Sequence, residues 1–203
     1  MKNLTLPLSE RLIEAGMQIL LSGETLTLRG AAARAGVSHG APAHHFDGLS
    51  GLRTAIAIKA FRDFGKFLRD ALDQPVPDDS DAPRQRLRNL GRAYCQFAQD
   101  QGTLFHLMLV HTEVDRDNPD LASAMQYAYE PLRIAAAPFT KGRDPVMIET
   151  MIWSLAHGYA MLGCAERVNS LAPPFGAPAL DDLMREMGIL GSLRTEDPTA
   201  AGQ

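Results

Sequence analysis

The sequence predicts an all-helical protein, with three short helices near the N-terminus followed by a larger helical region. Apolar residues recur at steps of three and four along most of the chain, which is typical of helices buried on one face. No segment shows the sustained alternation of apolar and polar residues that strands require. With 203 residues, of which 45% are hydrophobic and 22% charged, the chain has the composition of a soluble globular protein.

The first helix is expected from Leu8 to about residue 22, because a stripe of apolar residues ends at Gly23, a common helix terminator. Thr27 is placed to cap a second helix over 28–35, which Gly36 ends. Ser38 is placed to cap a third helix that runs to about residue 45. The sequence therefore predicts two short helices joined by a tight turn.

A fourth helix is expected from about residue 49 to 72, with one apolar stripe along it. The next stretch, 73–83, holds three prolines and four aspartates and predicts a linker. Further helices are expected at 84–100, 103–112, 119–137, 144–169 and 178–190, with a kink at Pro131. The predicted divisions are an N-terminal domain at 1–48, a connecting helix at 49–72, the linker, and a C-terminal domain at 84–203.

Charge is divided unevenly along the chain. The net charge of the whole chain is −4, but residues 1–70 carry +3 and residues 71–203 carry −7. The N-terminal part is therefore the candidate for contact with a polyanion such as DNA. The two cysteines have no spacing that suits a disulfide framework or a zinc site.

No segment predicts a membrane span or a secretory signal. The longest uncharged run, 150–165, is about 16 residues, whereas a membrane-spanning helix needs roughly 20 apolar residues. The N-terminal sequence lacks the basic and apolar regions of a signal peptide. We therefore expect a cytoplasmic protein that makes no membrane contact.

The segment 26–46 reads LTLRGAAARAGVSHGAPAHHF. Its Thr-capped helix, AGVS turn, short second helix and closing His-Phe resemble the DNA-binding signature of the TetR family, a resemblance that covers residues 8–68. The resemblance implies a helix-turn-helix in which the second helix enters the major groove and the first lies across the phosphates. The residues it assigns to DNA contact are Ser38, His39, Ala41 and His44, with Phe46 packed inward. Arg29, at the start of the second helix, is placed to contact phosphate.

Three positions depart from the family pattern. Ala43 and Leu49 stand where TetR-type proteins usually carry a tyrosine and a lysine, and Gly48 stands where an aspartate usually caps the next helix. Pro42 also removes a backbone hydrogen bond from the expected third helix. These departures predict unusually weak DNA binding.

A second resemblance lies further along the chain. The sequences WSLAHG at 153–158 and LFHLML at 104–109 are similar to the Trp-His-Gly class of TetR C-terminal domain, which senses ligands and forms dimers. We expect the ligand pocket to be lined by Phe105, Met108, His111, Trp153, His157 and Met161, since methionine and aromatic walls adapt to a ligand. A Met and aromatic stripe at helical spacing is also typical of ordinary core packing.

The helix expected at 144–169 is apolar on nearly all sides. Such a helix must be buried on one side in its own core and on another against a partner subunit. The residues expected in a dimer interface are Ile148, Ile152, Leu155, Tyr159, Leu162, Leu183 and Met187.

The predicted fold is therefore all-α, with an N-terminal three-helix helix-turn-helix DNA-binding domain and a C-terminal helical domain for ligand sensing and dimerisation. The expected partners are an operator in double-stranded DNA, a small-molecule effector and a second copy of the chain, with no cofactor and no metal. An enzyme is not expected, because no nucleophile, phosphate-binding or metal-binding motif is found. The alternative is a TetR-like helical ligand-binding or protein-interaction module that has weak or lost DNA binding.

Overall fold

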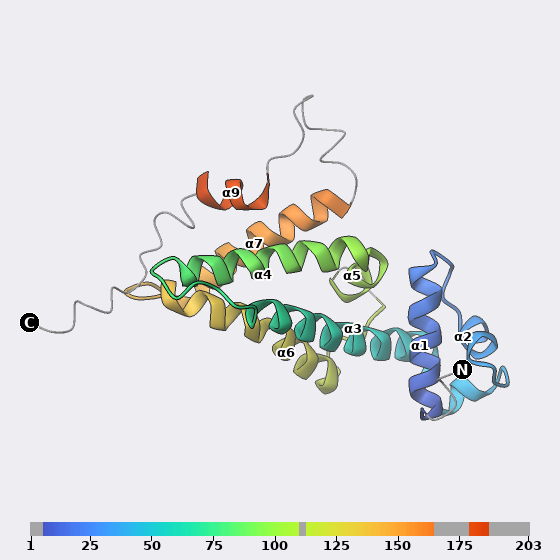
Figure 1. Cartoon of the computed structure of the whole chain (residues 1–203). Helices are drawn as coiled ribbons and strands as arrows, with labels where there is room; N and C mark the ends of the chain where they lie inside the picture. Colours follow the sequence, from blue (N-terminus) through green and yellow to red (C-terminus); the bar gives the residue numbers. More distant parts are fainter. Residues whose placement is uncertain (1–5, 110–112, 165–178, 187–203) are drawn as a thin grey trace, which may run out of the picture. The chain divides into compact units, whose positions relative to one another are not determined.

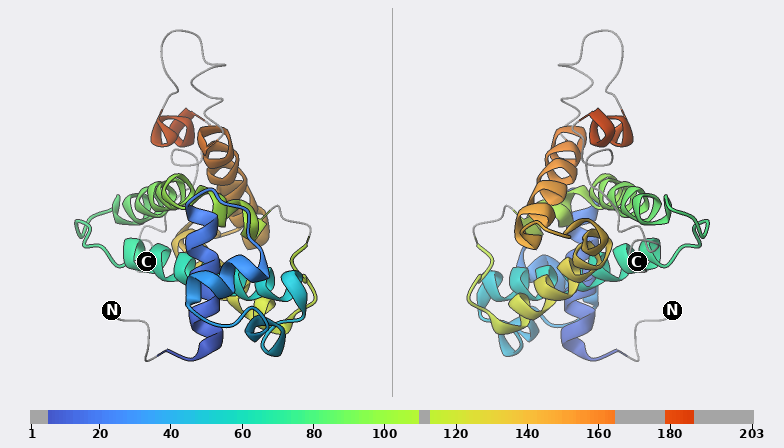
Figure 2. Two further views of the ribbon diagram at one scale, coloured as in Figure 1. Left: turned by 90° about the vertical axis from the view of Figure 1, so that its right-hand side faces the viewer. Right: turned by 90° about the vertical axis from the view of Figure 1, so that its left-hand side faces the viewer.

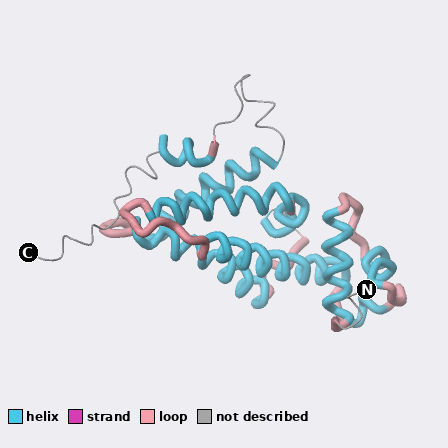
Figure 3. The backbone as a smooth tube through the Cα atoms, in the orientation of Figure 1, coloured by secondary structure: helices cyan, strands magenta, loops and turns pink. Residues whose placement is uncertain are grey.

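The structure, a computed structural model, describes residues 6–109, 113–164 and 179–186. Within these ranges all regular structure is helical and no strand occurs (Figure 3). The predicted all-α fold is thus confirmed. The α-helices are α1 (Leu8–Leu21), α2 (Leu28–Ala35), α3 (Gly48–Leu72), α4 (Ala82–Asp100), α5 (Gly102–Leu109), α6 (Pro119–Ala136), α7 (Pro145–Cys164) and α9 (Leu180–Glu186), with 3-10 turns η1 (Ala41–His44) and η2 (Ala137–Phe139).

The chain divides into two compact units. The N-terminal unit comprises Met1–Phe64 and Gln101–Tyr127, and the C-terminal unit comprises Gly65–Asp100 and Ala128–Gln203. The boundary between the two units after Phe64 falls within α3, and α5 belongs to the same unit as the N-terminal helices. The domain boundaries at 48, 72 and 83 that the sequence predicts stay predictions.

In the N-terminal unit α1 packs against both α2 and α5 (Figure 2). Leu12 on α1 and Ile56 on α3 are fully buried in this unit. Gly16 on α1 is required by close approach, because a Cβ there would stand 2.6 Å from the Ile56 side chain. The ion pair of Lys59 with Glu14 adds a contact between α3 and α1. The first turns of α3 are therefore fixed against the N-terminal helices.

In the C-terminal unit α4 and α7 lie side by side, and α9 contacts both (Figure 1). Gly91 leaves room for α9, since a Cβ there would lie 3.2 Å from the Leu180 side chain. An ion pair between Arg92 and Asp181 joins α4 to α9 beside that contact. None of the helices in the described ranges is long and apolar enough to span a membrane.

Apart from the third short helix, the helices begin and end close to the predicted residues wherever the structure describes them. The linker is two residues shorter than expected, because α4 begins at Ala82 with Pro83 in its first turn, where proline needs no N–H partner. α6 continues through Pro131 to Ala136. The predicted ends of the helices at 103–112, 144–169 and 178–190 lie in part outside the described residues.

Candidate functional site

The predicted cap and turn of the helix-turn-helix are confirmed in the N-terminal unit. The Thr27 hydroxyl accepts a hydrogen bond of 2.9 Å from the Gly30 N–H and so satisfies one free donor at the start of α2. Gly36 ends α2 with φ +69°, a left-handed conformation that side chains with a Cβ resist. The Arg11 guanidinium on α1 donates to the Ala35 carbonyl at 2.6 Å. Both ends of α2 are therefore held by specific contacts.

The predicted third helix is wrong in type and extent. Instead of an α-helix from Ser38 to about residue 45, the chain forms the single 3-10 turn η1 over Ala41–His44, and Ser38 caps no helix. Pro42 explains the difference, because it lacks an N–H and its ring disfavours the α conformation of the residue before it. The remaining donors bond three residues back, as His45 does to the Pro42 carbonyl at 3.0 Å.

The five residues expected at DNA lie on α2 and in or beside η1. Arg29, Ser38, His39 and His44 are exposed, and Ala41 is half-buried. Arg29 makes no ion pair with any residue that the structure describes, whereas Arg34 at the other end of α2 is bonded to Glu24 at 2.6 Å. The start of α2 therefore presents an available guanidinium together with backbone N–H groups, a combination that suits phosphate.

The three departures from the family pattern have different structural settings. Ala43 is exposed, so its short side chain leaves that surface open. Leu49 is half-buried at the start of α3. Gly48 has φ +64°, and no neighbouring atom within 4 Å would block a Cβ there. Backbone conformation, and not space, therefore accounts for glycine at position 48.

A polar cluster that the sequence did not predict fastens the segment after α5 to the first turns of α3. The Ser50 hydroxyl donates to the Glu113 carbonyl at 2.7 Å, and Arg53 forms an ion pair with the Glu113 carboxylate. The buried Thr54 hydroxyl accepts from the Asp115 N–H at 2.9 Å and donates to the Ser50 carbonyl. The sequence signal that could have revealed this cluster was Thr54, a polar residue on the apolar stripe of α3.

The predicted effector residues fall into two groups that lie in different units. In the N-terminal unit Phe105 and Met108 are buried on α5, and Phe105 meets Phe64 edge to face with ring centroids 6.2 Å apart. Both side chains are therefore part of a packed core. His111 lies outside the described residues.

In the C-terminal unit Trp153 and His157 are brought together with a residue that the sequence analysis missed, Tyr94. The Trp153 indole donates to the Tyr94 hydroxyl at 3.3 Å, and that hydroxyl lies 2.9 Å from Nδ1 of His157. Since the indole N–H can only donate, the hydroxyl proton is available to Nδ1. Burial raises the pKa of Tyr94 and lowers the pKa of His157.

This triad joins α4 to α7. Trp153 is 41% exposed, His157 is half-buried, and Met161 lies half-buried one turn further along α7. The neutral forms that burial favours keep the Tyr94 O–H as donor and the His157 Nδ1 as acceptor. A buried tyrosine hydroxyl needs a partner, which is the physical signal that Tyr94 offered on the apolar stripe of α4.

An apolar groove of about 520 Å³ lies between α7 and α9. Met151, Leu155, Tyr159 and Leu162 from α7 line it together with Leu183 from α9. Of the residues expected at a dimer interface, Leu155, Tyr159, Leu162 and Leu183 thus lie together on this surface.

At the start of α7 the exposed apolar face differs by about one residue from the face predicted for the interface. Ile148 and Ile152 are 3% and 5% exposed and belong to the core of their own unit, whereas Met147 and Met151 are 59% and 45% exposed. An all-round apolar helix gives no periodic signal that separates its two buried faces. Met187 lies outside the described residues.

Among the described residues no group of three or more His, Cys, Asp or Glu side chains is placed to hold a metal ion. Cys95 is buried, with its Sγ 4.0 Å from the Ala156 carbonyl. Its thiol therefore serves packing between α4 and α7.

A family model described as "Tetracyclin repressor-like, C-terminal domain" matches residues 87–187, about half of the chain. No curated protein matches the sequence. Among solved structures, a protein of unknown function from Rhodococcus sp. RHA1 has a TM-score of 0.73 and 22% identity, covering 93% of this chain and 95% of that one.

Two regulators are similar in fold. The fatty acid degradation regulator FadR from Bacillus halodurans has a TM-score of 0.62 and 14% identity, covering 95% of this chain and 99% of its own. The TetR family transcriptional regulator PfmR from Thermus thermophilus has a TM-score of 0.56 and 16% identity, with coverages of 89% and 96%. The chain therefore belongs to the TetR family, and residues 87–187 form its tetracyclin repressor-like C-terminal domain.

Proposed function

We propose that this chain is a one-component transcriptional regulator that binds palindromic operator DNA as a homodimer and acts as a repressor. The observation that carries the proposal is the start of α2, where Arg29 is exposed without an ion-pair partner among the described residues and Thr27 caps the helix. Residues 1–70 also carry a net charge of +3 in a chain of net charge −4. Both features suit a phosphate backbone.

The dimer is supported by the apolar surface of α7 and α9. Met151, Leu162 and their neighbours leave a groove of about 520 Å³ that is largely apolar, which is typical of surfaces that pair with a second copy. Two recognition elements in such a dimer would read half-sites roughly 34–36 Å apart, or a multiple of that spacing.

Release from DNA is proposed to follow binding of a small apolar or amphipathic effector by the C-terminal domain. Support comes from the Trp153, His157 and Tyr94 triad, which offers aromatic surface beside polar groups. Coupling between effector and operator is typically about 1–3 kcal/mol and reciprocal, so operator DNA must weaken effector binding by the same factor.

A gel shift with DNA from the protein's own promoter tests the proposal. The wild-type chain is expected to shift this DNA with two chains per site, and Arg29→Gln is expected to weaken binding to every sequence alike, because a phosphate contact carries no base information. Arg133→Gln in the C-terminal unit is the matched control and should bind as the wild type does.

The alternative function is a helical ligand-binding or interaction module without operator binding. The 3-10 turn at Ala41–His44, in place of a full recognition helix, is the observation that favours it. Absence of any shift at low salt, with a folded dimer present, would support this alternative and refute the regulator.

A further inference from the structure

A second cavity lies in the C-terminal unit, formed by the end of α3, the start of α4 and the end of α6. Its volume is about 330 Å³, at the lower end of the range of small-molecule sites. Its apolar wall includes Leu72, Pro138 and Ile134, and Ile134 is 46% exposed. None of the residues predicted for the effector, the operator or the dimer lines this cavity.

Two guanidinium groups and one carboxylate complete the lining. Arg69 and Asp73 come from the end of α3 and the turn after it, and Arg86 comes from α4. The charged groups of the cavity therefore sum to +1. A bound molecule with a single negative charge would neutralise them.

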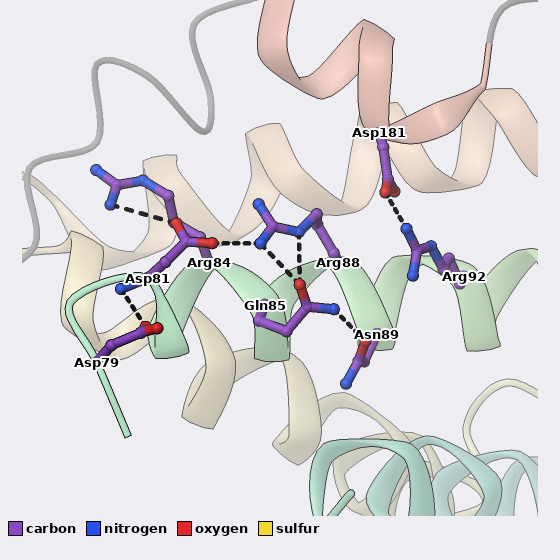
Figure 4. Close-up of polar contacts among 8 residues, drawn as sticks. All are labelled: Asp79, Asp81, Arg84, Gln85, Arg88, Asn89, Arg92 and Asp181. Carbon is purple, nitrogen blue, oxygen red and sulfur yellow. Dashed lines mark hydrogen bonds and ion pairs between the residues drawn. The ribbon is translucent and has the colours of Figure 1, made fainter. Parts of the chain in front are cut away.

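Arg86 differs from the other arginines of the first three turns of α4. Arg84 and Arg88 both pair with Asp81, and Arg92 pairs with Asp181, so each arginine on this face of the helix already has a carboxylate partner (Figure 4). Arg86 lies two residues from both Arg84 and Arg88, which places it about 200° around the helix from them. Its side chain is exposed and makes no ion pair with any residue in the described ranges.

We propose that this cavity binds a small organic monoanion, a carboxylate carried on a compact apolar body. Arg86 and Arg69 would hold the carboxylate, because a guanidinium donates two parallel hydrogen bonds to it. The apolar body would cover Ile134, which removes exposed apolar surface from water. The site is separate from operator binding and stands even if the chain binds no DNA.

The test uses the full chain with two ligands of nearly equal shape, octanoate and its neutral amide, octanamide. Ligand-observed NMR titration gives the dissociation constant of each at low ionic strength. Arg86→Gln removes the proposed partner of the carboxylate, and Arg84→Gln is the matched control on the opposite, paired face of α4. Circular dichroism confirms that both variants keep the helical content of the wild type.

The wild type is expected to bind octanoate at least about 10-fold more tightly than octanamide, the effect of one charge-assisted hydrogen-bonded pair. Arg86→Gln should abolish this preference without changing octanamide binding, and Arg84→Gln should retain it. Equal binding of the two ligands by the wild type, or equal losses in the two variants, would overturn the proposal. Competition by inorganic phosphate as strong as that of octanoate would also overturn it, because phosphate has no apolar body.

Discussion

At the scale of single residues, the Tyr94 hydroxyl is the centre of the polar contacts between α4 and α7. It accepts from the Trp153 indole and lies in hydrogen-bond contact with His157, while Cys95 beside it contacts the α7 backbone. Trp153 and His157 could be paired from their spacing of four residues on one helix. The sequence could not predict that Tyr94 contacts them. Tyr94 is 59 residues from Trp153, and only the packing of α4 against α7 brings the two side chains together.

Tyr94→Phe is expected to lower the free energy of unfolding by about 1–3 kcal/mol, because the Trp153 N–H and the His157 ring nitrogen lose their partner at a mostly buried site. Chemical denaturation followed by circular dichroism measures the change. Tyr127→Phe removes the same atom from a side chain that is 40% exposed and serves as the control, with an expected change within about 0.5 kcal/mol. Equal effects in the two variants would show that the Tyr94 hydroxyl does not stabilise the fold through Trp153 and His157.

The depressed pKa of His157 predicts a pH dependence of stability. Burial favours the neutral ring in the folded state, so the unfolded chain binds more protons at mildly acidic pH. The contribution of His157 is complete above its unfolded pKa of about 6.5 and is lost as the pH falls from there toward the folded pKa.

Denaturation of the wild type between about pH 8 and pH 5 should therefore show stability falling with acid, and His157→Gln should flatten part of that slope. A slope that is the same in both proteins would show that other groups carry the pH dependence.

At the scale of elements, the sequence predicts most accurately the features that depend only on neighbouring residues. The Thr27 cap, the Gly36 turn and the bounds of α2 depend on neighbouring residues, and all three are confirmed. The third helix was expected from Ser38 as its cap, and Pro42 limits the segment to a 3-10 turn. Which face of α7 is buried in the core and which is exposed depends on tertiary packing. The sequence cannot predict this, because a helix that is apolar on all sides has no periodic pattern that distinguishes its faces.

The turn between α2 and η1 can be tested with two glycines that differ in backbone conformation alone. Gly36 has φ +69° and Gly40 has φ −82°, and a Cβ at either meets no atom within 4 Å. Gly36→Ala is expected to destabilise the chain by about 1–2 kcal/mol, the cost of a left-handed residue with a Cβ. Gly40→Ala should be neutral or stabilising by up to about 1 kcal/mol. A smaller loss at Gly36 than at Gly40 in thermal or chemical denaturation would contradict the observed turn.

At the scale of the whole molecule, the apolar surface of α7 and α9 predicts a homodimer. Light scattering should report about twice the chain mass of 22.1 kDa at micromolar concentration. Met151→Glu places a charge in the groove and should shift the protein toward the monomer, since an unpaired charge is strongly disfavoured in a buried interface.

Met125→Glu is the control for the dimer, because Met125 is 40% exposed on α6 and lies outside the groove. It should leave the dimer intact. A monomeric wild-type chain would contradict the predicted homodimer. A dimer that survives Met151→Glu as well as Met125→Glu would have its interface elsewhere.

The central claim is that the N-terminal unit binds DNA, and the salt dependence of that binding tests it most directly. Fluorescence anisotropy gives the affinity for promoter DNA across a salt titration, for the wild type and for the double variant Ala43→Tyr with Leu49→Lys. The wild type is expected to bind weakly, and the double variant more tightly, with a slope of log affinity against log salt that is steeper by up to about one unit per restored phosphate contact in each subunit. If the wild type already binds at nanomolar level and the double variant changes neither affinity nor slope, other residues hold the phosphates. If neither protein binds DNA at any salt concentration, the claim is wrong and the chain is an interaction module.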